Sequence, residues 1–369
     1  MARIAIDARI IYTTTGRYIE NLIRNLAEID TVNEYIVLLD PKDIDRFDVP
    51  NMRFSKVAAP YEQFSFAEQF GFRGLLGRIN ADLVHFTVPH RPVLYFGKQV
   101  TTVHDLTLLK TYNSDKNWLI FHAKQFVGRF VFWSIARTSN RIITPTEFVK
   151  KDYQLFAHIK SDKITVTYEG AAETLASQEP IDYLVGKQFL LCVGNQSDYK
   201  NIRRLMQAHQ ELRKVNPELL LVCAGKLSGK NGVTLVRNKQ WAGEQGYEGI
   251  IYTDFVSDEQ LSWLYRHCAT YVFPSLMEGF GLPGLEAMAC GAPVASSNAT
   301  CLPEVYGDAA HYFNPLDTND MVRAISDILD NEHLRNGLIA KGFSRVGQFS
   351  WQRMTQQTLD VYQQVLAEK

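Results

Sequence analysis

Short apolar runs rich in β-branched residues alternate with helical patterns along most of this 369-residue chain. The first part contains the runs RIAIDARI, EYIVLLD, MRFSKVA, DLVHFTV, QVTTVHDL, RIITPT and KITVTYEG. The second part contains QFLLCVGN, LLLVCAGK, IIYTDFV, TYVFPS and PVASS. Strands that are separated by helical crossovers form parallel sheets covered by helices. The sequence therefore predicts an α/β protein with two such sheets.

A polar connection with little periodicity, AETLASQEPIDYLVG at residues 172–186, separates the two sets of strands. A chain of this length suits two domains of about 150 to 200 residues each. We expect a first domain at 1–172 and a second at 173–350. The last segment, 351–369, has apolar residues at helical spacing and predicts a terminal amphipathic helix.

The composition is that of a soluble globular protein, with 46% hydrophobic and 21% charged residues. A net charge of -1 gives no reason to expect nucleic acid as a partner. The five cysteines show no CxxC spacing, which favours buried free thiols in a reducing compartment. We find no signal pattern and no apolar stretch near the roughly 18 residues of a membrane span, so a cytoplasmic location is expected.

The stretch ATYVFPSLMEGFGLPGLEAMACGAPVASS, residues 269–297, predicts a strand, a glycine-rich loop, a helix and a second strand. Pro283 suits the first turn of the helix and Gly291 suits its end. Glu278 lies in the loop, and Glu286 follows it after seven residues, in what we expect to be the first helical turn.

Gly279 and Gly281 allow this loop to turn sharply and allow a ligand to approach the backbone. The free N–H groups at the start of the helix favour anionic oxygens, and two carboxylates can accept hydrogen bonds from sugar hydroxyls. An ordinary turn with a glutamate placed against the helix dipole is the alternative interpretation of the same residues.

As a whole, EGFGLPGLEAMACGAPV resembles the signature of the retaining glycosyltransferases of family 4. That resemblance implies the GT-B fold of two Rossmann-like domains and a terminal helix that crosses back to the first one. It implies a nucleoside-diphosphate sugar as donor, with no metal and no other cofactor. It also implies that Glu278 positions the transferred sugar and that Glu286 holds the ribose. The other donor-binding residues of this segment would be Gly279, Phe280, Gly281 and Leu282.

Another part of the expected donor site follows the first strand of the second domain, in CVGNQSDYKNIRR. Gly194 permits a tight turn, and Lys200 with Arg203 or Arg204 can place positive charge beside a helix start, where a diphosphate would bind. A solvated surface lysine is the alternative.

Three positions depart from the family pattern, and each puts a phosphate contact in doubt. Asn195 and Tyr199 stand where relatives often carry arginine, and Thr14 stands where they carry a second glycine. Ser257 with Glu259 or Gln260 predicts a helix cap, and the resemblance places Val256 beside the nucleobase.

In the first domain, His104 and Asp105 follow the strand in TTVHDLTLL. The resemblance places His104 near the donor sugar, facing the Glu278 loop, although a lone histidine at this point can also be structural. Thr15 and Gly16 precede a helix and are expected to bring N–H groups to a phosphate or to the acceptor.

Together with these residues, the resemblance implies a metal-independent retaining hexosyltransferase that uses GDP-mannose. Its acceptor would be a glycan or a polyprenol-linked oligosaccharide in bacterial surface polysaccharide or O-antigen assembly. A glucosyl- or rhamnosyltransferase using a UDP- or dTDP-sugar is one alternative. A nucleotide-sugar 2-epimerase and a degenerate sugar-nucleotide-binding protein are others. An oxidoreductase is the least favoured, because MARIAIDARIIYTTTG lacks the GxGxxG spacing of dinucleotide-binding proteins.

Residues 116–137, KNWLIFHAKQFVGRFVFWSIAR, combine aromatic and basic side chains. The cations are Lys116, Lys124, Arg129 and Arg137, and the aromatics are Trp118, Phe121, Phe126, Phe130, Phe132 and Trp133. A core-facing helix with a solvated basic side is one interpretation. Peripheral contact with the inner face of a membrane is the other, supported by a second aromatic stretch at residues 61–79.

Overall fold

The structure is a computed structural model that describes residues 1–369 except 14, 64, 112–117, 172–176, 226–231 and 369. The side chains of residues 118–121, 123, 124 and 232 are also outside the description. The chain separates into two compact units, and each is described by itself. Unit 1 comprises Met1–Leu109, His122–Gly170 and Ser350–Lys369, and unit 2 comprises Lys110–Phe121 and Ala171–Phe349.

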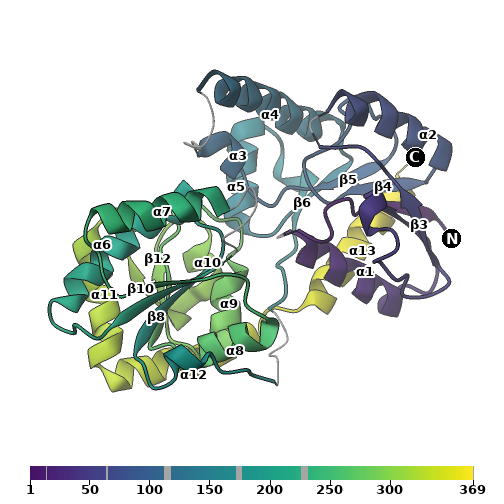
Figure 1. The fold of residues 1–369 in the computed structure, drawn as a ribbon. Helices are drawn as coiled ribbons and strands as arrows, with labels where there is room; N and C mark the ends of the chain where they lie inside the picture. The colour runs from purple at the N-terminus through teal and green to yellow at the C-terminus, as the bar shows by residue number, and fades with distance from the viewer. Residues whose placement is uncertain (14, 64, 112–117, 172–176, 226–231, 369) are drawn as a thin grey trace. The chain divides into compact units, whose positions relative to one another are not determined.

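Unit 1 contains a parallel sheet in which the described residues form seven strands (Figure 1). The strands are β1 (Arg3–Asp7), β2 (Glu34–Leu39), β3 (Phe54–Ala58), β4 (Leu83–Phe86), β5 (Gln99–Thr102), β6 (Arg141–Thr144) and β7 (Ile164–Val166). Their order across the sheet is β3-β2-β1-β4-β5-β6-β7. The order reverses between β1 and β4, where Ile6 pairs with His85. Ligands of open parallel sheets bind beyond the carboxyl ends of strands beside such a reversal.

Unit 2 contains a second parallel sheet, in which the described residues form six strands. The strands are β8 (Phe189–Val193), β9 (Leu220–Ala224), β10 (Ile250–Thr253), β11 (Thr270–Phe273), β12 (Val294–Ser297) and β13 (Ala310–Phe313). Their order is β10-β9-β8-β11-β12-β13, so the reversal lies between β8 and β11. This arrangement confirms the predicted α/β fold with two Rossmann-like parallel sheets.

The helices between the strands follow the predicted alternation. In chain order the α-helices are α1 (Gly16–Ile29), α2 (Arg73–Ile79), α3 (Thr107–Lys110), α4 (Trp118–Thr138), α5 (Glu147–Ala157), α6 (Ile202–Arg213), α7 (Gly232–Glu244), α8 (Asp258–His267), α9 (Leu282–Ala289), α10 (Leu302–Tyr306), α11 (Thr318–Asp330), α12 (Glu332–Val346) and α13 (Trp351–Ala367). Ser257 caps α8 in a reciprocal capping box with Gln260, which confirms the predicted cap.

Two packing features position the sheets. In unit 2, one apolar cluster joins Leu190 and Val272 of the sheet to Leu205 of α6 and Ile325 of α11. In unit 1, α13 buries the predicted apolar stripe, and the hydroxyl of Tyr362 lies 2.6 Å from Nδ1 of His85 on β4. Each sheet is therefore held by buried apolar contacts that leave its strand ends to carry polar groups.

Candidate functional site

The reversal point of unit 2 brings together the loops that follow β8 and β11. Gly194, directly after β8, has a φ of +122°, which residues with a Cβ rarely adopt. Its carbonyl oxygen lies so close to Gly225 that a Cβ there would be 2.4 Å away. Asn195 accepts a hydrogen bond from the N–H of Ser197 at 3.3 Å, so its side chain closes the turn. Glycine is required at both positions for this backbone path.

Lys200 and Glu278 form an ion pair at these strand ends. Nζ of Lys200 donates to Oε1 of Glu278 at 2.6 Å, and both side chains are 13% exposed. The ammonium also lies 5.1 Å from the ring centroid of Phe273 and 5.4 Å from that of Tyr199. An ammonium has three donors, and in the described part of the chain only Glu278 accepts from this one. Lys200 therefore retains two donors for an anion.

Burial alone would lower the pKa of Lys200, because desolvation disfavours a charged amine. The negative charge and hydrogen bond of Glu278 outweigh that effect, and the pKa of Lys200 is raised. The side chain consequently stays cationic at every physiological pH.

The loop after Glu278 depends on one glycine for its conformation. Gly281 has a φ of +99° and is followed by α9, with Pro283 in the first turn as predicted. A Cβ on Gly281 would lie 2.5 Å from the hydroxyl of Tyr306, which donates to its carbonyl at 2.6 Å. Gly279 does not have a positive φ, so of these two glycines Gly281 is the one whose backbone conformation favours glycine.

The side chains beside this loop differ in their exposure. Phe280 is buried edge-on against Phe349, with the ring centroids 5.6 Å apart. Leu282, the first residue of α9, is half-buried. The side chain of Phe280 therefore packs inside unit 2.

Glu286 lies deeper in α9 than predicted. The helix begins at Leu282, so Glu286 lies beyond its first turn, and the interpretation that placed it there was wrong. The side chain is 8% exposed, and the hydroxyl of Tyr265 donates to its Oε2 at 3.3 Å. The residue thus has a protein partner that the sequence did not indicate.

The two arginines after Lys200 differ in what they bind. Nε of Arg203 donates to Oδ1 of Asn238 at 2.9 Å, and its guanidinium lies 5.2 Å from the ring centroid of Trp241. Arg204 donates to Oδ1 of Asn201 and to the carbonyl of Pro315, both at 3.0 Å. Arg204 therefore braces the start of α6, which argues against its predicted role as a phosphate cation.

At the end of β10, Val256 is half-buried. The neighbouring side chain of Phe255 is 71% exposed. The predicted nucleobase contact of Val256 stays a prediction.

The loop before α1 in unit 1 is more closed than predicted. The N–H of Gly16 donates to the carbonyl of Thr13 at 3.0 Å. It is therefore not available to a phosphate, contrary to the prediction. A Cβ on Gly16 would lie 1.6 Å from the carbonyl oxygen of Ile11, so glycine serves close packing here. Thr15 is half-buried and makes no side-chain cap for α1, and Thr14 lies outside the described residues.

His104 is held by unit 1 through both ring nitrogens. Nε2 lies 3.0 Å from the carbonyl oxygen of Thr87, and Nδ1 lies 3.2 Å from Oε1 of Glu169. The carbonyl oxygen of Thr87 can only accept, so Nε2 carries a proton, and Nδ1 faces the Glu169 carboxylate. Burial lowers the pKa of His104, but the hydrogen bond and charge of Glu169 reverse that effect, and the pKa is raised. Asp105 accepts from the N–H of Thr107 at 2.7 Å and so begins α3.

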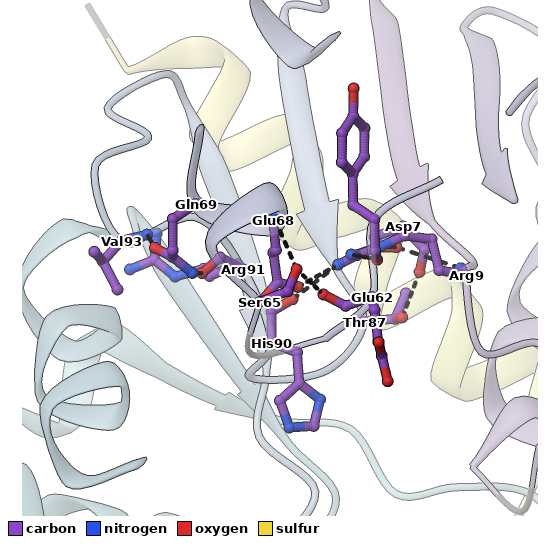
Figure 2. A network of polar contacts seen from close by, with 11 residues as sticks. Asp7, Arg9, Glu62, Ser65, Glu68, Gln69, Thr87, His90, Arg91 and Val93 are labelled. Carbon is purple, nitrogen blue, oxygen red and sulfur yellow. Dashed lines mark hydrogen bonds and ion pairs between the residues drawn. The ribbon is translucent and has the colours of Figure 1, made fainter. Parts of the chain in front are cut away.

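The reversal point of unit 1 also carries a buried network that sequence reasoning missed. Figure 2 shows Arg9 between two carboxylates, donating to Oδ2 of Asp7 at 2.8 Å and to Oε1 of Glu68 at 2.9 Å. Arg9 also donates to the carbonyl of Tyr61, and Thr87 donates to that of Asp7 at 2.6 Å. An aspartate and an arginine two residues apart at the end of an apolar strand were the signal available in the sequence.

Helix α4 presents two different faces. Val131, Phe132 and Ile135 are buried, whereas Phe126, Phe130 and Trp133 are 76%, 52% and 47% exposed. The exposed face thus carries aromatic side chains beside the exposed Arg129 and Arg137, and the buried face agrees with a core-facing helix. The predicted contributions of Lys116, Trp118, Phe121 and Lys124 lie outside the described side chains. Within the described residues, none of the helices combines the length and apolar character that a membrane crossing requires.

Comparisons with known proteins agree with this geometry. The family model for glycosyl transferases group 1 matches residues 178–345, and that for Glycosyltransferase Family 4 matches residues 15–173. The O-antigen chain mannosyltransferase B of Escherichia coli is 31% identical over 75% of this chain and 72% of its own length. The serotype-specific mannosyltransferase WbdA of Escherichia coli is 31% identical over 69% of this chain and 32% of its own length.

A solved structure extends the likeness of the fold to the whole chain. The sucrose-phosphate synthase of Thermosynechococcus elongatus superposes with a TM-score of 0.79 at 18% identity, covering 100% of both chains. The chain belongs to the group 1 glycosyltransferases with the GT-B fold, because the family model matches its second half, a relative is 31% identical, and its two parallel sheets superpose on a solved structure.

Proposed function

We propose that this protein is a metal-independent, retaining mannosyltransferase that uses GDP-mannose. Its acceptor would be a glycan or a polyprenol-linked oligosaccharide in O-antigen or related surface polysaccharide assembly. The observation that carries the proposal is the Lys200–Glu278 pair, 2.6 Å apart at the reversal point of the unit 2 sheet. The choice of mannose rests on the names of two relatives, both called mannosyltransferases.

The pair suits the two charges that change in glycosyl transfer. The bond between the anomeric carbon and the phosphate oxygen breaks, so negative charge grows on the departing nucleoside diphosphate. Lys200 keeps two donors for those oxygens. Glu278 accepts hydrogen bonds and would position the sugar as its ring gains positive charge. The acceptor hydroxyl then bonds to the anomeric carbon, and its proton passes to the departing phosphate.

The helix starts beside the pair add further donors. Asn201 directs its side chain to the carbonyls of Pro274 and Pro315 instead of capping α6. Gly281 precedes α9 and offers no side chain. The first N–H groups of these helices consequently favour an anion, and Glu286 lies farther along α9, where it would accept from the ribose. The role of His104 beside the donor sugar, which the resemblance implies, stays a prediction.

A panel of nucleotide sugars tests this proposal. The full chain is incubated with GDP-mannose, UDP-glucose and a dTDP-sugar, with and without a chelator, and release of nucleoside diphosphate is measured. We expect GDP release that the chelator does not change, and an α-linked product once an acceptor is supplied. Release from another donor would refute the choice of mannose. Absence of release from all donors would favour the degenerate binding protein.

We also propose that the exposed face of α4 contacts an anionic membrane. Exposed Phe66 and Phe70, at 86% and 66%, extend the aromatic surface toward the π-helical turn η2 (Glu68–Phe72). Arg137 adds positive charge, 5.2 Å from the ring centroid of Trp133. Aromatic rings beside arginine suit the headgroup region of a bilayer.

Buried Arg91 connects the two parts of this surface. Its backbone carbonyl accepts from Gln69 of η2 at 3.2 Å, and its guanidinium donates to Ser134 of α4 at 3.5 Å and to Thr138. The aromatic residues of η2 and α4 therefore belong to one continuous part of unit 1.

Flotation with vesicles that contain anionic phospholipid tests the membrane proposal. Phe130→Glu should reduce the floated fraction, whereas Val215→Glu, at a 90% exposed position of unit 2, should not. If wild-type protein stays at the bottom of the gradient, the surface has another role.

A further inference from the structure

The loop that carries Glu278 is fastened from one side by the segment that leads into α10. The hydroxyl oxygen of Thr300 accepts from the N–H of Glu278 at 3.3 Å. The thiol of Cys301 donates to the carbonyl of Glu278 at 3.3 Å and to that of Phe280 at 3.5 Å. With the bond from Tyr306 to Gly281, three side chains from residues 300–306 bind the backbone of residues 278–281. We call residues 300–306 the clamp.

Thr300 occupies an unusual backbone conformation within this clamp. Its φ is +56°, in the left-handed region where β-branched residues are genuine outliers. The other non-glycine residues with positive φ in the described chain are Asn80, His158 and Asn201, none of which is β-branched. Strained residues of this kind persist where the surrounding structure fixes them, and they cluster at functional sites.

The strain at Thr300 coincides with a specific contact to the site. A glycine would adopt this φ without penalty but would supply no hydroxyl. The hydroxyl of Thr300 accepts from the amide of the residue whose carboxylate lies 2.6 Å from Lys200. A fixed amide of Glu278 also fixes the backbone from which its side chain starts. This matters because a displacement of about 1 Å in a catalytic group can already reduce the rate strongly.

We propose that Thr300 is a positioning residue that holds the Glu278 carboxylate in register with Lys200 for the transfer reaction. Threonine at this position carries backbone strain that glycine would not, but it supplies the hydroxyl that binds the N–H of Glu278. Cys301 and Tyr306 bind carbonyl oxygens of residues 278–281, and Thr300 is the member of the clamp that binds the N–H of Glu278. The inference rests on the proposed glycosyl transfer and adds to it a residue outside the predicted site.

A set of Thr300 variants separates positioning from a structural role. Thr300→Gly removes the hydroxyl and relieves the strain, so its melting temperature should be no lower than that of the wild type. Its kcat should nevertheless fall by about tenfold or more, with a smaller change in KM. Thr300→Ser restores the hydroxyl and should recover kcat to within about twofold of the wild type. Thr300→Val keeps the shape but not the acceptor, and its kcat should fall as in Thr300→Gly.

His158→Gly is the matched control, because His158 has a φ of +52° at the end of α5 in unit 1. It should relieve similar strain and leave kcat unchanged. The assay is release of nucleoside diphosphate from the donor that the wild type uses. A wild type without release refutes the proposed function, and amide hydrogen exchange at Glu278, faster in Thr300→Gly than in wild type, then tests the clamp by itself. Wild-type kcat in Thr300→Gly, or a kcat in Thr300→Ser as low as in Thr300→Gly, would overturn the inference.

Discussion

The reversal points of the two sheets carry the same kind of pair, a cation against a carboxylate, and use it differently. In unit 2, Lys200 gives one donor to Glu278 and keeps two. In unit 1, Arg9 at the reversal point is held by Asp7 and Glu68, and His104, which follows β5, has both ring nitrogens occupied by Thr87 and Glu169. Lys200 therefore keeps two donors without an acceptor among the described residues, whereas these donors of unit 1 are bound by the protein itself.

This difference shows that the position of a polar cluster is easier to predict from the sequence than whether its donors are already bound by the protein. Both sites lie where polar side chains follow strands beside a change in strand order. Only the three-dimensional partners distinguish a free donor from one that the chain itself has bound. The comparison predicts that changes in unit 1 will alter mainly stability and that changes in unit 2 will alter mainly turnover.

The largest expected effect is the loss of the Arg9 network. Arg9→Leu should lower the free energy of unfolding by about 3 to 5 kcal/mol, because it leaves two buried carboxylates without their cation. Arg323→Leu is the control, since Arg323 pairs with Asp320 and Asp327 at the surface and is 47% exposed. It should cost at most about 1 kcal/mol. Equal costs in urea unfolding would contradict the distinction between the buried and the exposed networks.

Glu278→Ala should reduce kcat by about 10²- to 10³-fold, because the sugar and Lys200 both lose their partner. Glu211→Ala provides the control, since Glu211 also lies 2.6 Å from a lysine, Lys214, on an exposed surface. It should leave kcat unchanged. Steady-state turnover of the donor measures both, and wild-type turnover in Glu278→Ala would remove Glu278 from the site.

Glu169→Gln should make stability less dependent on pH. The pKa of His104 is raised above its ordinary value of 6.5, so the pair stabilises the folded state fully below that value. The stabilisation is lost as pH rises through the folded pKa. The difference in unfolding free energy between wild type and Glu169→Gln should be about 1 kcal/mol near pH 6 and shrink by pH 9. A difference that does not vary with pH would show that His104 is neutral.

Tyr306→Phe should have the smallest effect on stability, about 1 kcal/mol for the lost hydrogen bond to Gly281. Tyr312→Phe is matched to it, because the Tyr312 hydroxyl donates to the carbonyl of Gly307 at the same distance of 2.6 Å. The two variants should have similar melting temperatures, but only Tyr306→Phe should lower kcat. Similar kcat values would limit the clamp to a structural role.

Much of the fold could be predicted because buried parallel strands are recognisable in the sequence as short apolar runs. The strand that the sequence did not reveal is β13, whose four residues Ala310–Phe313 include a histidine and lack a β-branched residue. The start of α9 was recognised from Pro283, yet Glu286 is the fifth residue of this helix and therefore lies beyond its first turn of about 3.6 residues.

The site was predictable only where one segment carried it. Glu278 and Lys200 were both identified, but their contact spans 78 positions and no local pattern indicates it. The Glu68 partner of Arg9 and the Glu169 partner of His104 were missed for the same reason, because 59 and 65 positions separate them in the chain. Gly16 was misinterpreted because a glycine needed for packing looks the same in sequence as one needed for a ligand.

Binding of a nucleoside diphosphate tests the central claim that Lys200 is held ready for an anion. Calorimetric titration with GDP should give a Kd for Lys200→Ala at least about tenfold weaker than for wild type, as expected for a lost charged hydrogen bond. Lys214→Ala should bind as the wild type does. Equal GDP affinity in Lys200→Ala and wild type would contradict the account, because the donor site would then lie elsewhere.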